Sequence, residues 1–280
     1  MKITPFENIK SKVSQKVPSD VVGALPNKWE KLGSVVIIKI PDGLHKYQQT
    51  IGKIYAEELH CSTALNDRGG ISGVYREPNV EVIYGSQNTE TIHMENGIRY
   101  RIDPQRIMFS SGNLEERQRM AKVSNAEETI VDLFAGIGYF TLPMAVYSRP
   151  RRIVACEINP LAYRYLCENV VLNHVSRVVE PVLGDNRQTA PRDCADRVIL
   201  GYLKQSYHFL RIALECLRNS SGILHYHELV PSTLVPEQPL RHIEEAGKQI
   251  DRSVELLETH VIKSYAPGIH HVVLDVKVLE

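Results

Sequence analysis

Hydrophobic and polar residues form short blocks over the first part of the chain. A β-branched apolar run at residues 35–40 predicts a strand that ends at Pro41-Asp42-Gly43, and helical spacing follows over residues 46–60. Later apolar blocks predict three further strands, at residues 80–84, 91–94 and 98–102. We therefore expect a small α+β domain at residues 35–110, preceded by an N-terminal extension at residues 1–34.

Strand and helix patterns alternate from Thr129 onward, as a parallel α/β sheet requires. The boundary between the two styles of sequence falls near residues 105–125, so we expect a second domain at residues 111–280. The last two β-rich segments predict an antiparallel hairpin at the edge of the sheet, formed by residues 254–265 and 270–279. An ending of this kind is typical of class I methyltransferase folds.

A glycine-rich turn follows the first strand of this second domain. Residues 130–140 read I-V-D-L-F-A-G-I-G-Y-F, and a helix is expected over residues 141–147. Gly136 and Gly138 would let the main chain turn tightly and approach a ligand. Such a turn can also serve packing alone. Polar residues at the next strand ends would favour a binding site instead.

Two later strand ends carry polar side chains as well. Glu157 follows the strand at residues 153–156, roughly twenty residues after Gly136, where a Rossmann-type site places a carboxylate on ribose hydroxyls. The strand at residues 179–183 ends at Gly184-Asp185-Asn186, beside the position expected for an adenine. Three successive strand ends therefore predict a nucleoside-binding site.

The acidic residue inside the turn distinguishes between two kinds of cofactor. Asp132 would repel a dinucleotide pyrophosphate, and the turn lacks the third glycine of the dinucleotide fingerprint. S-adenosylmethionine carries a sulfonium and an ammonium group, which a carboxylate favours. We therefore predict an α/β fold in which a class I S-adenosylmethionine-dependent, Rossmann-like domain follows the small α+β domain.

Composition restricts the remaining possibilities. The 280 residues have a formal net charge of zero, so an RNA-binding surface would need cations gathered on one face. Five scattered cysteines without a C-x-x-C pair predict reduced thiols and a cytoplasmic location. No apolar run of about 18 residues predicts a membrane span. We expect no obligatory protein partner.

A few isolated residues have more than one interpretation. His225 and His227 share a face of a predicted strand without a third ligand, so we expect core histidines and no metal. Arg149, Arg151 and Arg152 form a basic cluster that could contact phosphates or be only a solvated loop. Tyr202, after the fourth strand, could stack on a flipped base or simply pack.

Four motifs resemble one family of RNA-modifying enzymes. They are V-D-L-F-A-G-I-G-Y-F at residues 131–140, A-C-E-I-N-P at 155–160, G-D-N at 184–186 and H-M-E-N-G-I-R-Y-R-I-D-P at 93–104. By these motifs the chain is identified as a member of the archaeal and eukaryotic enzymes that modify position 37 of tRNA. This family has two activities, methylation of guanine N1 and, in wybutosine synthesis, transfer of an aminocarboxypropyl group.

Two departures favour the second activity. The methyltransferase branch has a segment resembling F-S-P-R-L-x-x-E-R, whose first arginine helps catalysis, and a strand end resembling N-L-P, whose asparagine faces the target base. Gly112 and Gly201 stand at those two positions here. The resemblance thus implies transfer of the 3-amino-3-carboxypropyl group to 4-demethylwyosine in the anticodon loop of phenylalanine tRNA, releasing 5′-methylthioadenosine. The alternatives are guanine-N1 methylation and a non-catalytic tRNA-binding module.

The resemblance also implies roles for individual residues. Ser110 and Arg117 would hold the amino-acid part of the cofactor, with Arg117 pairing with its carboxylate, while Glu157 would bind ribose. Arg117 could instead belong to a solvated ion-pair face, and Ser110 to a turn or helix cap. No general base is identified. The complete expected cofactor set is Ser110, Arg117, Asp132, Phe134, Gly136, Gly138, Glu157, Ile158, Asp185 and Asn186.

Overall fold

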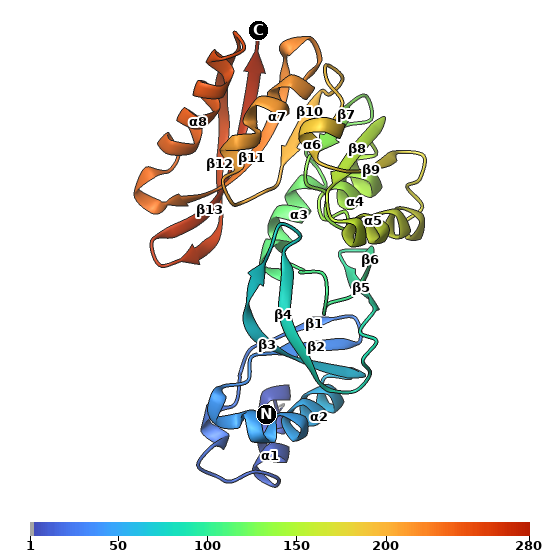
Figure 1. The fold of residues 1–280 in the computed structure, drawn as a ribbon, viewed down its shortest axis with the longest axis vertical. Coiled ribbons are helices and arrows are strands. Elements are labelled where there is room, and N and C mark those ends of the chain that lie inside the picture. The colour runs from blue at the N-terminus through green and yellow to red at the C-terminus, as the bar shows by residue number, and fades with distance from the viewer. Residues whose placement is uncertain (1–2) are drawn as a thin grey trace. The chain divides into compact units, whose positions relative to one another are not determined.

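The computed structural model describes residues 3–280 and divides them into two units along the chain (Figure 1). Unit 1 ends at Ser111, and unit 2 runs from Gly112 to Glu280. The sequence patterns predict a change of domain near residues 105–125. Within residues 3–280, every helix is too short or too polar to cross a membrane.

Unit 1 contains a mixed four-stranded sheet, a separate hairpin and two helices. The strand order in the sheet is β1-β2-β3-β4, and β5 pairs with β6. Its elements are α1 (Pro5–Ser14), β1 (Trp29–Leu32), β2 (Val35–Ile38), α2 (Gln48–Glu58), β3 (Thr63–Ser72), β4 (Glu77–Tyr84), β5 (Thr91–Glu95) and β6 (Ile98–Ile102). Short 3₁₀ helices lie at Val22–Ala24 and Asp42–Tyr47, and a third, Ser111–Asn113, includes the last residue of unit 1 and the first two of unit 2.

The segment expected as an N-terminal extension shares the core of unit 1. Ile9 and Val13 of α1 are fully buried in the same apolar cluster as Ile51 and Tyr55 of α2. The capping box between Thr4 and Glu7 starts α1. Residues 3–34 are therefore built into this unit, because their apolar stripe has a helix and a sheet to pack against, whereas residues 1 and 2 lie outside the described chain.

Unit 2 is built on a seven-stranded sheet with the order β12-β13-β11-β10-β7-β8-β9. The strands from β11 to β9 are parallel, while β13 and β12 run antiparallel at one edge and form the predicted hairpin. The strands are β7 (Thr129–Asp132), β8 (Arg152–Glu157), β9 (Val179–Leu183), β10 (Arg197–Leu200), β11 (Gly222–Pro231), β12 (Ser253–Ala266) and β13 (Ile269–Leu279). The α-helices are α3 (Leu114–Met120), α4 (Thr141–Pro143), α5 (Pro160–Leu172), α6 (Asn186–Thr189), α7 (Leu210–Cys216) and α8 (Glu237–Lys248).

Short helical turns complete unit 2. The segment after α4 continues as a π-helix at Met144–Ser148, so the helix predicted over residues 141–147 is present with a wider second turn. Three 3₁₀ turns lie at Ser206–Phe209, Arg218–Ser220 and Ser232–Leu234. All four residues of β7 and of β10 are buried, as expected for central strands that are covered on both faces.

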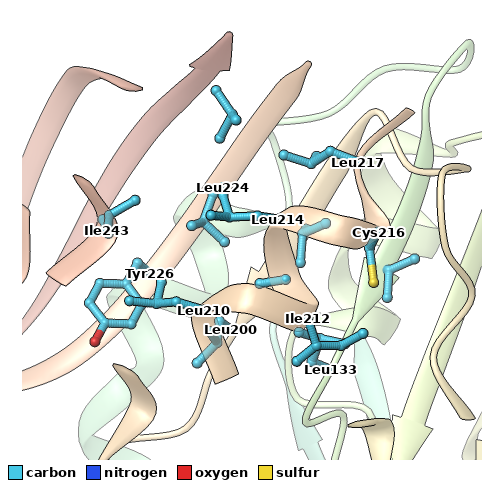
Figure 2. Close-up of a cluster of buried hydrophobic side chains, with 14 of the residues drawn as sticks. Leu133, Leu200, Leu210, Ile212, Leu214, Cys216, Leu217, Leu224, Tyr226 and Ile243 are labelled. Atoms are coloured by element: carbon cyan, nitrogen blue, oxygen red, sulfur yellow. The ribbon is translucent and has the colours of Figure 1, made fainter. Parts of the chain in front are cut away.

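Helices α7 and α8 cover one face of this sheet. Figure 2 shows the apolar core that they form with the strands, in which Leu214 and Ile243 pack with Leu224 and Tyr226 of β11. Side chains alternate along a strand, so His225 and His227, the residues before and after Tyr226, point to the other face. That face carries α3, since Nε2 of His227 lies 3.9 Å from a carboxylate oxygen of Glu116.

Candidate cofactor site

The three polar strand ends predicted from the sequence lie next to one another in unit 2. Strands β7, β8 and β9 are parallel neighbours, so their carboxyl ends at Asp132, Glu157 and Leu183 share one edge of the sheet. Ligands of open parallel α/β sheets bind at this edge. The edge therefore defines the candidate site.

The side chain of Asp132 holds the turn by hydrogen bonds. Its carboxylate is fully buried and accepts hydrogen bonds from the Thr141 hydroxyl at 2.7 Å and from the N–H of Phe134 at 3.2 Å. Burial raises the pKa of Asp132 to about 6, although both hydrogen bonds act in the opposite direction. This aspartate fixes the start of the turn to the first helical residue that follows it.

The two glycines of the turn are required by its geometry. Gly136 and Gly138 have φ angles of +58° and +101°. A Cβ atom on Gly138 would lie 2.6 Å from Cγ of Leu142, and one on Gly136 would lie 2.5 Å from a ring carbon of Tyr139. Any other residue at either position would be strained and crowded.

Glu157 joins the turn to the next strand end. Its two carboxylate oxygens accept the N–H of Gly136 at 2.8 Å and the N–H of Asn159 at 2.7 Å. Burial raises the pKa of this carboxyl group, and the main-chain hydrogen bonds oppose the shift. Each oxygen keeps a second lone pair, so Glu157 can also accept hydroxyl groups of a ribose. The neighbouring Ile158 presents a partly exposed apolar side chain.

The third strand end combines a helix cap with an unsatisfied acceptor. Asp185 caps α6 and pairs with Arg187 at 2.5 Å, and this hydrogen bond lowers the pKa of the aspartate. Asn186 is buried and donates through Nδ2 to the carbonyl oxygen of Leu133 at 2.7 Å. Its Oδ1 atom is buried without a hydrogen-bond partner within residues 3–280. An unpaired buried acceptor is costly, so an N–H donor of a ligand would suit this position.

Aromatic rings gather at the same edge. Phe134 stacks on Tyr202 with ring centres 4.9 Å apart and meets Phe209 edge to face at 4.9 Å. Tyr202 therefore packs against the turn, which satisfies the packing interpretation for one face of its ring. Phe209 was not anticipated, because its position near the start of α7 carried no motif.

The two residues expected to hold the amino-acid part of the cofactor fall in different units. Arg117 of α3 is 2% exposed, so the interpretation as a solvated ion-pair face is wrong for this arginine. Ser110 belongs to unit 1, whereas the other nine expected residues lie in unit 2. On the same helix, Glu116 and Arg119 form an ion pair.

A buried charged network on the α3 face was missed by the sequence analysis. Arg119 bonds to Glu116 at 2.8 Å and to Asp275 of β13 at 2.5 Å, and His225 lies 2.6 Å from the same aspartate. Burial alone would raise the pKa of Asp275, but the hydrogen bonds with His225 and Arg119 outweigh it and lower the pKa. Arg197 extends the network, since its guanidinium lies 2.7 Å from His225.

Glu258, His260 and Asp275 lie close enough to offer ligands to one cation. Arg119 already neutralises Asp275, and Glu258 is largely exposed, so this cluster is better described as part of the network. His225 and His227 are both 1% exposed, and the prediction of buried histidines on this strand is confirmed.

Family models match almost the whole chain. Residues 9–89 match the TYW2 N-terminal domain, and residues 91–257 match the TRM5/TYW2 methyltransferase domain. The chain belongs to the TRM5/TYW2 family. This confirms the predicted resemblance and, with the parallel sheet described above, the predicted Rossmann-like fold.

Relatives with both activities of the TRM5/TYW2 family align over most of the chain. A Pyrococcus horikoshii protein named tRNA(Phe) (4-demethylwyosine(37)-C(7)) aminocarboxypropyltransferase is 39% identical, covering 97% of this chain and 96% of the relative. A Pyrococcus abyssi protein named tRNA (guanine(37)-N(1))-methyltransferase Trm5b is 36% identical, covering 94% of this chain and 78% of the relative. Identity alone therefore separates the two activities only weakly.

Solved structures of TYW2 members are similar over nearly their full length. The structure of P. horikoshii TYW2 in complex with MeSAdo has a TM-score of 0.88 and 37% identity, covering 98% of this chain and 99% of that chain. The structure of M. jannaschii TYW2 in complex with AdoMet has a TM-score of 0.75 and 39% identity, covering 90% and 99%.

Proposed function

We propose that this protein transfers the 3-amino-3-carboxypropyl group of S-adenosylmethionine to the 4-demethylwyosine base at position 37 of phenylalanine tRNA. The observation that carries the proposal is the alignment with the P. horikoshii aminocarboxypropyltransferase, which covers 97% of this chain and 96% of that protein. The glycines at positions 112 and 201 support the same choice between the two activities of the family. The enzyme would act in the cytoplasm, where its five free cysteines would stay reduced.

The strand ends fit the cofactor. Glu157 would bind the ribose hydroxyls, Ile158 would cover one face of the adenine, and the unpaired Oδ1 of Asn186 would accept an adenine N–H. Phe134, Gly136 and Gly138 would line the turn, and Asp132 would hold that turn in place and contribute negative charge below it. Arg117 would pair with the cofactor carboxylate, and Ser110 would contact its amino-acid part.

Positioning decides which product forms. When bound, the cofactor would supply an electrophilic methylene. Its C–S bond would break as the C–C bond to the base carbon forms, with the sulfur leaving as the thioether of 5′-methylthioadenosine and the base carbon losing its proton to solvent. The residues of this chain would select that carbon by holding the amino-acid part in line with the base. The choice of product would therefore depend on how the cofactor is oriented, and not on an acid or base with a strongly shifted pKa.

Neighbouring side chains fill the places where the methyltransferase branch has its arginine and asparagine. A Cβ atom on Gly112 would lie 3.0 Å from Nζ of Lys263, and one on Gly201 would lie 3.2 Å from the ring of Phe140. A longer side chain at either position would have to displace Lys263 or Phe140. We therefore expect Gly112→Arg and Gly201→Asn each to slow aminocarboxypropyl transfer by roughly tenfold.

Labelled cofactor tests the reaction directly. The protein would be incubated with tRNA carrying 4-demethylwyosine and with S-adenosylmethionine labelled in either its methyl or its carboxyl carbon. Carboxyl label in the tRNA, with release of 5′-methylthioadenosine, would establish the proposed transfer. Methyl label in the tRNA, with release of S-adenosylhomocysteine, would establish the methyltransferase alternative, and stoichiometric cofactor binding without turnover would identify a binding module.

Unit 1 is the part of the chain that we propose contacts the anticodon loop. Its β3–β4 hairpin exposes the apolar side chains of Ile71, Val74 and Tyr75, and Arg76 lies beside them. Exposed rings and cations suit single-stranded RNA, because bases stack on aromatic faces and phosphates attract cations. Tyr75→Ala should then weaken tRNA binding about fivefold or more without changing cofactor affinity.

A further inference from the structure

An arginine-lined hollow lies at the amino ends of the strands in unit 2. Its volume is about 710 Å³, and its lining includes Thr129 at the start of β7 and Val179 at the start of β9. The glycine-rich turn that contains Gly136 and Gly138 follows the carboxyl end of β7, so the hollow is at the opposite edge of the sheet. Four arginines line it, namely Arg151, Arg152, Arg177 and Arg218.

Two of these guanidinium groups share one carboxylate. Arg151 lies 3.8 Å and Arg218 lies 3.6 Å from the oxygens of Asp196. Their closer hydrogen bonds go to neutral oxygens, since Arg151 donates to the Thr129 hydroxyl at 2.9 Å and Arg218 donates to the carbonyl of Cys194 at 2.7 Å. These bonds hold both side chains in place without neutralising them.

Of the other two arginines, one has an ion-pair partner within the described chain and one does not. Arg152 pairs with Glu180 at 2.5 Å, whereas Arg177 is exposed and has no hydrogen bond or ion pair with any of residues 3–280. Four cations against the two carboxylates of Asp196 and Glu180 leave a surplus of two positive charges. Asp196 is counted as the ion-pair partner of two lining arginines, whereas among the described residues the nearby Asp193 has no ion pair with them, and its carboxylate accepts the N–H of Asn219 at 2.7 Å. This surplus is local, because the net charge of the chain is zero.

We propose that this hollow binds a phosphate group. Guanidinium groups match phosphate oxygens in charge and geometry. The negative charge of a phosphate would balance the two excess positive charges of the arginines. The hydroxyl of Ser176 in the lining adds a further donor. The phosphate could belong to the backbone of an RNA or to a free phosphorylated molecule, and the proposal does not depend on the reaction catalysed at the other edge.

The test compares Arg151→Gln/Arg177→Gln with a matched control. Arg211 and Arg241 are also exposed arginines outside the lining, and each pairs with a glutamate four residues later in its helix, so Arg211→Gln/Arg241→Gln removes the same two charges elsewhere. Binding of pyrophosphate and of tRNA would be measured by titration calorimetry and fluorescence anisotropy for the full chain. Cofactor affinity, measured in parallel, reports whether each variant is folded.

We expect the double variant to bind its phosphate ligand at least tenfold more weakly than the wild type and the control. If RNA is the source, the affinity for tRNA falls. The slope of the logarithm of affinity against the logarithm of salt concentration also becomes shallower by about two. If a free ligand is the source, only pyrophosphate binding falls. Equal affinity of all three proteins for both probes, or equal losses in the double variant and the control, would overturn the proposal.

Discussion

Unit 2 buries carboxylates in two regions, and it holds them in opposite ways. Beside the glycine-rich turn, Asp132 and Glu157 accept mainly main-chain N–H groups, and burial raises the pKa of both. On the α3 face, Asp275 is held by the side chains of Arg119 and His225, and its pKa is lowered. The first region depends on backbone shape and the second on pairs of charges, so they should respond differently to substitution.

The largest effect is expected from breaking the side-chain network. Arg119→Met would leave the carboxylates of Glu116 and Asp275 buried without their shared cation. Removing one partner from a buried ion pair typically costs about 3–5 kcal/mol of unfolding free energy. Urea denaturation of the variant and the wild type would measure the loss.

Arg211→Met is the matched control for this variant, because Arg211 forms an exposed ion pair within one helix. Exposed pairs contribute roughly 0–1 kcal/mol. Equal losses for the two variants would mean that the network adds nothing beyond an ordinary surface pair.

A smaller but more local effect is expected from disturbing the turn. Gly138→Ala would place a Cβ atom 2.6 Å from Leu142 at a φ angle of +101°. We expect a loss of about 2–3 kcal/mol from this strain, together with weaker cofactor binding. Calorimetric titration with S-adenosylmethionine would show the loss of affinity, whereas Gly43→Ala, which has open space around its Cβ position, should leave both quantities unchanged.

The pH dependence of stability separates Asp132 from Asp275. The pKa of Asp132 is about 6 in the fold and 3.8 for the free group, so the fold binds the extra proton and loses up to about 3 kcal/mol as pH rises from 4 to 6. Asp275 has the opposite sign, because its lowered pKa stabilises the fold above pH 4 and that contribution is lost in stronger acid.

Asp132→Asn should remove the first of these two dependences. The free energy of unfolding of the variant, measured relative to the wild type, should therefore increase from pH 4 to pH 6. A difference between the two proteins that stays constant over this range would show that Asp132 has an ordinary pKa in the fold.

The smallest effect is expected at the exposed ion pair of the third strand end. Arg187→Gln removes the partner of Asp185, but the aspartate still caps α6 through the N–H of residue 187. We expect no measurable change in thermal stability and less than about a threefold change in cofactor affinity. A larger loss of affinity would mean that the guanidinium itself contacts the cofactor.

The sequence predicted the turn region well because the necessary information is contiguous. The alternation of strands and helices, the two glycines and the acidic strand ends are all local patterns, and the resulting edge contains Asp132, Glu157 and Asp185 as expected. Whether these residues bind the cofactor remains a prediction. The bond from Asn186 to the carbonyl of Leu133 spans 53 residues and had no signature in the sequence.

The charged network could not have been predicted in the same way. Arg119 and Asp275 are 156 residues apart, and neither lies in a motif. Helix α1 was also missed, although its signals were present in the capping box of Thr4 and Glu7 and in the spacing of Ile9 and Val13. Local spacing specifies elements and turns, whereas partners across a sheet depend on packing that one sequence does not reveal.

The ammonium group of Lys263 lies 3.0 Å from the position that a Cβ atom on Gly112 would take, so these two positions should not vary independently. An arginine introduced at residue 112 would meet a second cation at the position that Lys263 occupies. Replacement of Lys263 would relieve that repulsion, so the effect of the arginine depends on which residue is already present at position 263. Substitutions in the 3₁₀ turn before α3 and in the C-terminal hairpin are therefore expected to be epistatic, with an arginine at residue 112 better tolerated once Lys263 has been replaced.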